Sequence, residues 1–403
     1  TEPIAIALCA TKAVELLGQP PEKMQVYCSG NIIKNVKSVV VPHGDGMCGI
    51  EAAASLGSFG GKASLGLEVL RDTDKTALLK AKAFIDSGAI SVFHAKSIES
   101  LFIRIIVSAN DQSAEAQISR SHNHFSFLRH NQTILLQEQE GKTDMVLEEE
   151  LNFEDILSFI NQLDPLKDAE LIDLLRTQAD CNLAIAEEGL RGDYGASVGK
   201  TLLEAYPDHL STRLRAYAAA GSDARMAGSP MPVVINSGSG NQGMTVSLPL
   251  IVYAKENSID SLKLCRALAL SNLLAIYMKA LIGKMSAFCG VVSAAAGAGA
   301  GLCYLQDKGA DDMAQVISTT LLTSGGVFCD GAKASCASKI AIAIENALLA
   351  IEMQKHGRSL PPREGLAGRD IDETIRNIGR AAKEGMHTTD EVILDIMING
   401  KPG

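Results

Sequence analysis

The sequence predicts an α+β protein in which a small α/β-sandwich-like unit is inserted into a predominantly α-helical domain. Hydrophobic residues make up 46% of the 403 residues, aromatic residues only 4%, and Trp is absent. A core of such small side chains suits closely crossed helices better than a β-sandwich. Nearly everything from residue 153 onward has the apolar spacing of helices. Runs with β character are largely confined to residues 75–152.

The expected elements begin with a helix over residues 3–18, which has Pro in its first turn and Gly at its end. Residues 23–41 are expected to be extended around a polar turn at Gly30-Asn31, and a Gly-rich region follows. We assign residues 1–74 to the N-terminal part of the helical domain.

The inserted α+β unit is expected to span residues 75–152. It begins with a helix and continues through the strand-like runs ISVFHA, LFIRIIVSAN, AEAQISRS and TILLQEQE. Residues 153–403 then form the main helical domain, which is interrupted by three Gly-rich polar loops at 236–243, 323–333 and 358–370. Polar loops between strongly apolar helices are where we expect functional groups.

The charge balance favours a small-molecule ligand. A net charge of −10 and a pI near 5.4 leave no basic stripe for nucleic acid. Nine Cys without a secretory signal indicate a reducing compartment, so a cytoplasmic protein is expected. The uncharged run Met285–Leu305 is long enough to span a membrane. It lacks the bulky side chains that drive insertion, so we expect a buried central helix and no membrane partner. The apolar helical core and acidic surface suit a homodimer.

Three cysteines in the last third of the chain form the strongest candidate metal site. Cys329 and Cys336 are seven residues apart in VFCDGAKASCASKI, and Cys289 precedes a run of small residues. Three thiolates would bind three irons of a [4Fe–4S] cluster and leave the fourth iron open as a Lewis acid. The spacing Cys-x6-Cys is not a ferredoxin pattern, so three buried structural cysteines are the alternative.

The loop NSGSGNQG is the main candidate for binding a substrate. Its glycines imitate a dinucleotide fingerprint, but a helical region follows where a βαβ unit is required, which argues against a nucleotide. A polar loop at a helix N-terminus offers free N–H groups that suit a carboxylate; a plain helix-entry loop is the alternative. The candidate binding residues are Asn236, Ser237, Gly238, Ser239, Gly240 and Asn241.

Polar groups near the amino terminus form a second candidate for binding an amino acid. The residues concerned are Thr1, Glu2, Ser29, Asn31, Lys34 and Asn35. On their own they do not distinguish a binding site from an ordinary polar loop. His122, His124 and His130 could bind zinc, but surface histidines are favoured because no Cys or carboxylate accompanies them nearby. Cys28 lies beside the polar loop and is a candidate reactive thiol.

Three segments together indicate a family. NSGSGNQG, CGVVSAAAGAGAGLCYL and VFCDGAKASCASKI resemble the L-serine dehydratase alpha-chain-like family, most closely its L-cysteine desulfidase branch. The resemblance covers nearly the whole chain. It implies a [4Fe–4S]-dependent lyase, independent of pyridoxal phosphate, that forms pyruvate, ammonia and hydrogen sulfide from L-cysteine, or pyruvate and ammonia from L-serine. Cys289, Cys329 and Cys336 match the family's cluster ligands.

The chain departs from the family at its start. The family's opening motif is Gly-Cys-Thr-Glu-Pro, and its Cys is the proposed base, whereas this chain opens with Thr1-Glu2-Pro3. As written, the chain is expected to bind a cluster but to turn over poorly. Cys28 is not assumed to replace the missing Cys, because the family segment resembles Ser-Pro-Asn with Ser29 and Asn31 in register.

Two rival classes of function stay open. A pyridoxal-phosphate lyase would use NSGSGNQG as a phosphate cup and Lys333 or Lys339 as the Schiff-base lysine. A non-catalytic amino-acid-binding protein would keep the pocket but hold no iron.

Overall fold

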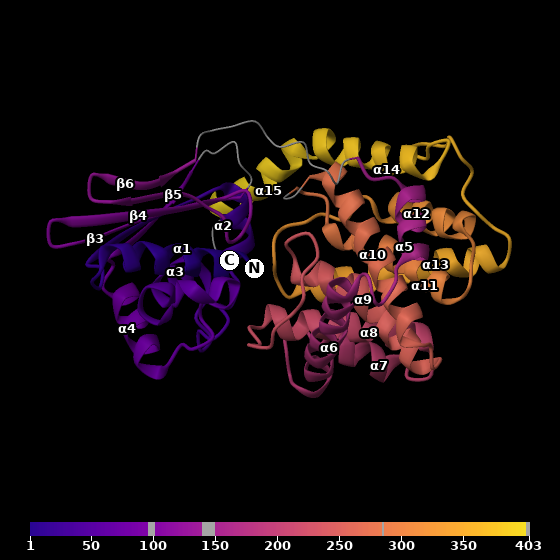
Figure 1. The fold of residues 1–403 in the computed structure, drawn as a ribbon, viewed down its shortest axis with the longest axis horizontal. Coiled ribbons are helices and arrows are strands. Elements are labelled where there is room, and N and C mark those ends of the chain that lie inside the picture. Colours follow the sequence, from indigo (N-terminus) through magenta and orange to yellow (C-terminus); the bar gives the residue numbers. More distant parts are fainter. Residues whose placement is uncertain (96–100, 139–149, 284–285, 400–403) are drawn as a thin grey trace.

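The computed structural model describes residues 1–95, 101–138, 150–283 and 286–399, which form an α/β lobe and a helical lobe (Figure 1). This confirms the helix-dominated α+β class. The α/β lobe contains α1 (Glu2–Leu17), β1 (Lys23–Cys28), α2 (Gly30–Val36), α3 (Gly49–Gly60), the 3-10 helix Ala63–Glu68, α4 (Lys75–Asp86), β2 (Ile90–His94), β3 (Phe102–Ala109), β4 (Gln112–Ser119), β5 (Phe125–His130) and β6 (Thr133–Gln137). The helical lobe contains α5 (Phe153–Gln162), α6 (Ala169–Arg191), α7 (Val198–Ala205), α8 (Leu210–Met226), α9 (Gly240–Glu256), α10 (Ser261–Ile282), α11 (Gly290–Leu305), α12 (Ala310–Ser324), α13 (Ser335–Lys355) and α14 (Ile371–Arg380). The π-helical turn Ala381–Gly385 and α15 (His387–Asn399) follow.

A mixed six-stranded sheet is the frame of the α/β lobe. Its strand order is β2-β1-β3-β4-β5-β6, with β1 parallel to β2 and every other neighbouring pair antiparallel. In β1, Val26 pairs with Val92 on one side and with Ile105 on the other. Strand residues alternate between faces, so buried positions such as Ile103 and Val107 of β3 lie on the face covered by α1.

The first 74 residues belong with the sheet, which differs from the expected division. One apolar core extends from Ala5 to Ile118 and includes α1, β1 and α3. The expected boundary at residue 74 therefore does not separate two hydrophobic cores. Residues 23–41 also differ, since 23–28 form the strand β1 and residues 30–36 form α2, with Val40 extended again in a bridge to Cys48. The reason is that Ile32, Ile33 and Val36 recur at helical spacing and are buried together.

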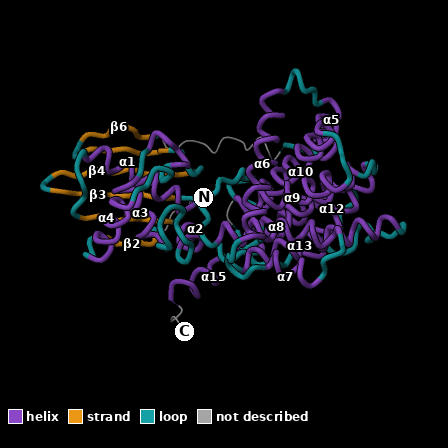
Figure 2. Tube along the Cα trace, turned by 90° about the horizontal axis from the view of Figure 1, so that it is seen from below, coloured by secondary structure: helices purple, strands orange, loops and turns teal. Residues whose placement is uncertain are grey.

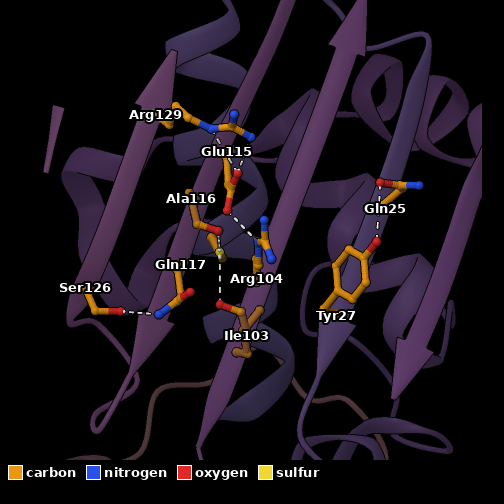
Figure 3. Close-up of polar contacts among 10 residues, drawn as sticks. Gln25, Tyr27, Ile103, Arg104, Glu115, Ala116, Gln117, Ser126 and Arg129 are labelled. Carbon is orange, nitrogen blue, oxygen red and sulfur yellow. Dashed lines mark hydrogen bonds and ion pairs between the residues drawn. The ribbon is translucent and has the colours of Figure 1, made fainter. Parts of the chain in front are cut away.

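The sheet face opposite α1 carries an ion-pair network (Figure 3). Glu115 on β4 is only 3% exposed, and its carboxylate accepts hydrogen bonds from Arg129 at 2.6 Å and from Arg104 at 2.5 Å. Two arginines from neighbouring strands thus satisfy the buried charge. Beside them, Tyr27 stacks on Phe93 with ring centroids 4.9 Å apart.

Helix α11 lies at the centre of the helical lobe, and every residue in it except Tyr304 is buried. A Cβ on Gly297 would lie 2.6 Å from the carbonyl oxygen of Ser271, so this glycine lets α10 approach closely. The structure confirms the buried helix expected from the run Met285–Leu305, of which Met285 itself lies outside the described residues. Within the described part of the chain, one helix, α10, is long and apolar enough to span a membrane, and 67% of its apolar window is buried inside the protein.

The two lobes meet around the amino terminus, which lies between them in both views (Figure 1, Figure 2). Helix α15 leaves the helical lobe and packs on α2 of the α/β lobe. There the ammonium of Lys34 forms an ion pair with Asp390, and the ammonium of Lys37 donates to the backbone carbonyl of Met397. We call the region where α2, the amino terminus and the loops of the helical lobe meet the junction.

Candidate active site

Two cysteine-bearing segments of the helical lobe run side by side. Phe288 and Phe328 form an antiparallel bridge, and the N–H of Cys289 donates to the carbonyl oxygen of Val327 at 3.1 Å. Residues that flank a bridged pair project to the same face of the two segments. Cys289 and Cys329 therefore point to the same side, where their thiols are hydrogen-bond partners.

Cys336, in the first turn of α13, completes a group of three thiols. Its Sγ donates to the carbonyl oxygen of Gly331 at 3.7 Å. Cys336 is 9% exposed, Cys289 is 6% exposed and Cys329 is half-buried. The three thiols are close enough for charge on one to raise the pKa of another. No three His, Cys, Asp or Glu side chains among the described residues are arranged to hold a single metal ion.

The three thiols differ in acidity. The hydrogen bond from Cys289 lowers the pKa of Cys329, and the ammonium groups of Lys34 and Lys279 lower it further against the effect of burial. The same hydrogen bond, together with burial, raises the pKa of Cys289. Burial also raises the pKa of Cys336. Cys329 is therefore the first of the three to form a thiolate, which is the form that binds metal.

Two buried lysines lie beside the thiols. Lys34 on α2 is 3% exposed and is paired with Asp390 of α15. Lys279 on α10 is 5% exposed, and burial lowers its pKa while Cys329 and Cys289 act in the opposite direction. Both ammonium groups thus favour negative charge on the thiols.

The loop 236–243 leads into α9. The hydroxyl oxygen of Ser239 accepts a hydrogen bond from the N–H of Gln242 at 3.4 Å and so caps the helix. The side-chain amide of Asn236 donates to the Oδ1 of Asn272 at 2.9 Å, and the hydroxyl of Ser237 donates to the Oδ1 of Asn236 at 2.9 Å. Asn236 and Ser237 therefore shape the loop and fix it to α10.

The first turn of α9 presents unsatisfied side-chain atoms. Asn241 and Gln242 are each 6% exposed, and their side-chain oxygens have no hydrogen-bond partner. Gln242 lies against Gly290, where a Cβ would be 2.6 Å from the Gln242 oxygen, so this amide is next to Cys289. Buried oxygens without partners are rare, which marks this turn as a place for a ligand.

The α/β lobe contributes an acidic group to the junction. The side-chain amide of Asn35 donates to Oε1 of Glu2 at 3.1 Å, and Nε2 of His122 lies 4.0 Å from the same oxygen. The ring of His122 faces Gly238, where a Cβ would lie 3.0 Å from Cε1. The interpretation of His122 as a surface histidine was wrong, because its side chain is only 14% exposed and lies between the lobes. His124 instead contacts Glu138 at 2.9 Å.

Cys28, Ser29 and Asn31 are the remaining candidates of the amino-terminal segment. Cys28 is fully buried in the core of the α/β lobe, and burial raises its pKa, so the structure does not support it as a reactive thiol. Ser29 is 4% exposed, and its hydroxyl oxygen accepts from the N–H of Phe102 at 3.4 Å, which ties β1 to β3. Asn31 lies half-buried on α2.

The candidate Schiff-base lysines are both paired with Asp330. The ammonium of Lys339 lies 2.5 Å from the carboxylate and that of Lys333 lies 3.7 Å from it. Although burial opposes it, Asp330 raises the pKa of Lys339 above its ordinary value. A lysine that forms a Schiff base needs a lowered pKa, so this geometry disfavours Lys339 in that role.

The sequence pattern also contains two junction residues that we did not single out. Lys279 is the single charge in LLAIYMKALIG, and Arg225 lies in the Ala-rich segment YAAAGSDARMAG. A charged residue within an otherwise apolar helix is costly unless it is paired or functional. That signal was available for Lys279, whereas Arg225 shares its segment with Asp223.

Comparison with known proteins identifies the family. The family model described as serine dehydratase alpha chain matches residues 66–395. The chain belongs to the serine dehydratase alpha-chain family. It is 43% identical over 401 residues to a UPF0597 protein of Finegoldia magna, covering 99% of this chain and 95% of that protein. It is 44% identical over 401 residues to a UPF0597 protein of Lachnoclostridium phytofermentans, covering 99% of this chain and 95% of that protein. It is 39% identical over 407 residues to a UPF0597 protein of Treponema denticola, covering 99% of this chain and 94% of that protein.

Membership in the serine dehydratase alpha-chain family confirms the resemblance seen in the sequence. It supports an amino-acid lyase as the kind of function. The family match includes the loop 236–243 and all three cysteines of the thiol group.

Proposed function

We propose that the protein is a [4Fe–4S]-dependent L-cysteine desulfidase, independent of pyridoxal phosphate. The reaction converts L-cysteine and water to pyruvate, ammonia and hydrogen sulfide. The observation that supports it is the gathering of Cys289, Cys329 and Cys336 beside two buried lysines. The second candidate is an L-serine dehydratase on the same scaffold, which the description of the matching family favours.

The thiol group fits an iron–sulfur cluster by its donor chemistry. Three cysteines would each bind a different iron, so they need not converge as the ligands of a single ion do. Lys34 and Lys279 would offset the negative charge of three thiolates. When bound, such a cluster supplies an open iron that acts as a Lewis acid on the leaving group.

Residues of both lobes would orient the amino acid. The N–H groups of Gly240 and Asn241, at the start of α9, suit its carboxylate. The carboxylate of Glu2, held by Asn35, suits its ammonium group. The side chain of Thr1 lies beside this site, where its hydroxyl oxygen accepts from Arg225 at 3.3 Å. Asn236, Ser237 and Ser239 would act by holding the loop in shape.

We also propose a cytoplasmic homodimer that acts on free amino acids. All nine cysteines are free of disulfides, as expected in a reducing compartment. The acidic charge favours neither nucleic acid nor an anionic membrane surface.

The test is anaerobic reconstitution of the protein with Fe²⁺ and sulfide, followed by iron analysis and pyruvate formation from a panel of amino acids. We expect about four irons per chain, a broad visible absorption that air abolishes, and faster turnover of L-cysteine than of L-serine. Faster turnover of L-serine would establish the second candidate. A visible band that borohydride bleaches would indicate pyridoxal phosphate, and amino-acid binding without iron or pyruvate would indicate a binding protein.

Single cysteine variants sharpen this test. Cys329→Ala should lose iron and activity together. Cys303→Ala is the matched control, because Cys303 is a buried cysteine of α11, about 21 Å along the helix axis from Cys289. Equal iron content in the two variants would contradict the assignment of the ligands.

A further inference from the structure

Arg225 lies in the last turn of α8 and contacts several segments of the junction. Its Nη2 donates to the hydroxyl oxygen of Thr1 at 3.3 Å. Burial lowers its pKa, while the nearby Glu2 and Cys336 act in the opposite direction. The guanidinium of the helical lobe is thus next to the amino-terminal segment and to the thiol group.

The Gly-rich loop makes room for this guanidinium. A Cβ on Gly240 would lie 2.2 Å from Nε and 2.6 Å from Cζ of Arg225. Because Gly240 has no side chain, the guanidinium lies directly against the first residue of α9. The N-terminus of a helix carries unsatisfied N–H groups and the positive end of its dipole. Two groups that favour anions are therefore adjacent.

The protein does not satisfy this guanidinium. The hydrogen bond to Thr1 is the single one that Arg225 makes among the described residues, and it forms no ion pair with their carboxylates. A guanidinium has five N–H donors in a fixed planar fork that matches a carboxylate. Four of them are therefore left for water or for a bound anion.

Unpartnered acceptors lie on the same turn of α9. The side-chain oxygens of Asn241 and Gln242 have no hydrogen-bond partner, and both residues are more than nine-tenths buried. A positively charged hydrogen-bond donor, Arg225, and free acceptor oxygens, on Asn241 and Gln242, are together complementary to a zwitterion. An α-amino acid carries its carboxylate and its ammonium group on one carbon atom, so both can engage at once.

We propose that Arg225 binds the α-carboxylate of the substrate, while the side-chain oxygens of Asn241 and Gln242 accept hydrogen bonds from its α-ammonium group alongside the carboxylate of Glu2. The choice of an amino acid as substrate rests on the proposed function. This arrangement makes Arg225 the residue that restricts the site to amino acids with a free carboxylate. Gly240 has a positioning role, since it allows the guanidinium to reach the loop.

The experiment compares L-cysteine with L-cysteinamide, which lacks the carboxylate. In Arg225→Gln, kcat/KM for L-cysteine should fall about 10- to 100-fold, while kcat/KM for L-cysteinamide stays unchanged. Arg225→Lys should retain part of the preference, and added methylguanidine should restore part of it in Arg225→Gln. The matched control is Arg213→Gln on the same helix, which pairs with Glu256 and should behave as wild type. An unchanged preference in Arg225→Gln would overturn the proposal.

Calorimetric binding of the same two compounds separates this proposal from the lyase function. A carboxylate preference that disappears in Arg225→Gln, in a protein without turnover, would retain the role of Arg225 and refute the lyase. Normal turnover together with an unchanged binding preference in Arg225→Gln would retain the lyase function and refute the role of Arg225. If Arg225→Gln unfolds, Gly240→Ala carries the test: it should raise KM for L-cysteine several-fold, with a melting temperature close to wild type, and an unchanged KM counts against the proposal.

Discussion

The α-carbon of Gly331 packs directly against the backbone of Lys34. A Cβ on Gly331 would lie 2.3 Å from the carbonyl oxygen of Lys34, and Gly331 has a φ of +95°. Only glycine adopts that conformation without strain and allows this approach. The contact joins the loop between Cys329 and Cys336 to α2, so the docking of the two lobes and the shape of the thiol group depend on each other.

Gly331→Ala should therefore disturb both the docking of the two lobes and the shape of the thiol group. We expect a loss of about 1–3 kcal/mol from backbone strain alone, a melting temperature lowered by a few degrees, and reduced iron content after reconstitution. Gly326→Ala is the control, because Gly326 lies earlier in the same connection between α12 and α13, with no atom within 4 Å of its Cβ position and without a positive φ. If both variants melt and bind iron like wild type, the contact between Gly331 and Lys34 contributes neither to stability nor to iron binding.

The helical lobe was predictable because its signals are local. The run of small residues that forms α11, and the Gly-rich loops between helices, can be recognised within about 20 residues of sequence. Strand β1 was expected to be extended, but its place in the sheet was not predictable, because its pairing partners Val92 and Ile105 lie about 65 and 80 residues away in the chain. A six-residue segment does not specify which sheet it joins, so the division at residue 74 could not be corrected from the sequence.

The same distinction applies to the site. The three cysteines, which the structure brings near one another, and the loop 236–243 could be singled out as candidates because they belong to recognisable segments. His122 was misread because its environment is supplied by Glu2 and Gly238, which are more than 100 residues away on either side. The burial of Cys28 likewise depends on a core that residues 5–118 build together.

His122 is predicted to position the amino-terminal segment against the Gly-rich loop. His122→Ala should raise KM for L-cysteine several-fold, because it removes the ring that lies 4.0 Å from Oε1 of Glu2 and against Gly238, with a smaller effect on kcat. Steady-state kinetics on the reconstituted enzyme measure both constants. His130→Ala, in the same α/β lobe, is the control and should leave KM unchanged. Equal effects of the two substitutions would mean that the position of His122 between the lobes is irrelevant to binding.

Cys28→Ala should leave the rate of pyruvate formation within about two-fold of wild type. The reason is that Cys28 is fully buried and burial raises its pKa, so it does not supply a thiolate. Removing its sulfur from the core should cost about 1 kcal/mol of stability through the small cavity left behind. A large loss of rate in a protein that melts normally would restore Cys28 as a candidate base.

Asp223 should make stability depend on pH. This carboxyl group lies in α8 with 1% exposure, and burial raises its pKa to about 6 even though the N–H of Gly199 donates to it at 3.1 Å. The pKa of Asp223 in the folded protein is thus above its ordinary value of 3.8. The stability that Asp223 contributes is therefore fully present below pH 3.8 and is lost as the pH rises through about 6.

Asp223→Asn removes the cost of burying this charge. The variant should match wild type near pH 4 and should be more stable by about 1–2 kcal/mol at pH 7–8, measured as the difference between the two melting curves across that range. Asp208→Asn, at an exposed position, is the control and should show no such divergence. A constant difference between Asp223→Asn and wild type from pH 4 to 8 would mean that the Asp223 carboxyl group titrates no differently in the folded and unfolded chains.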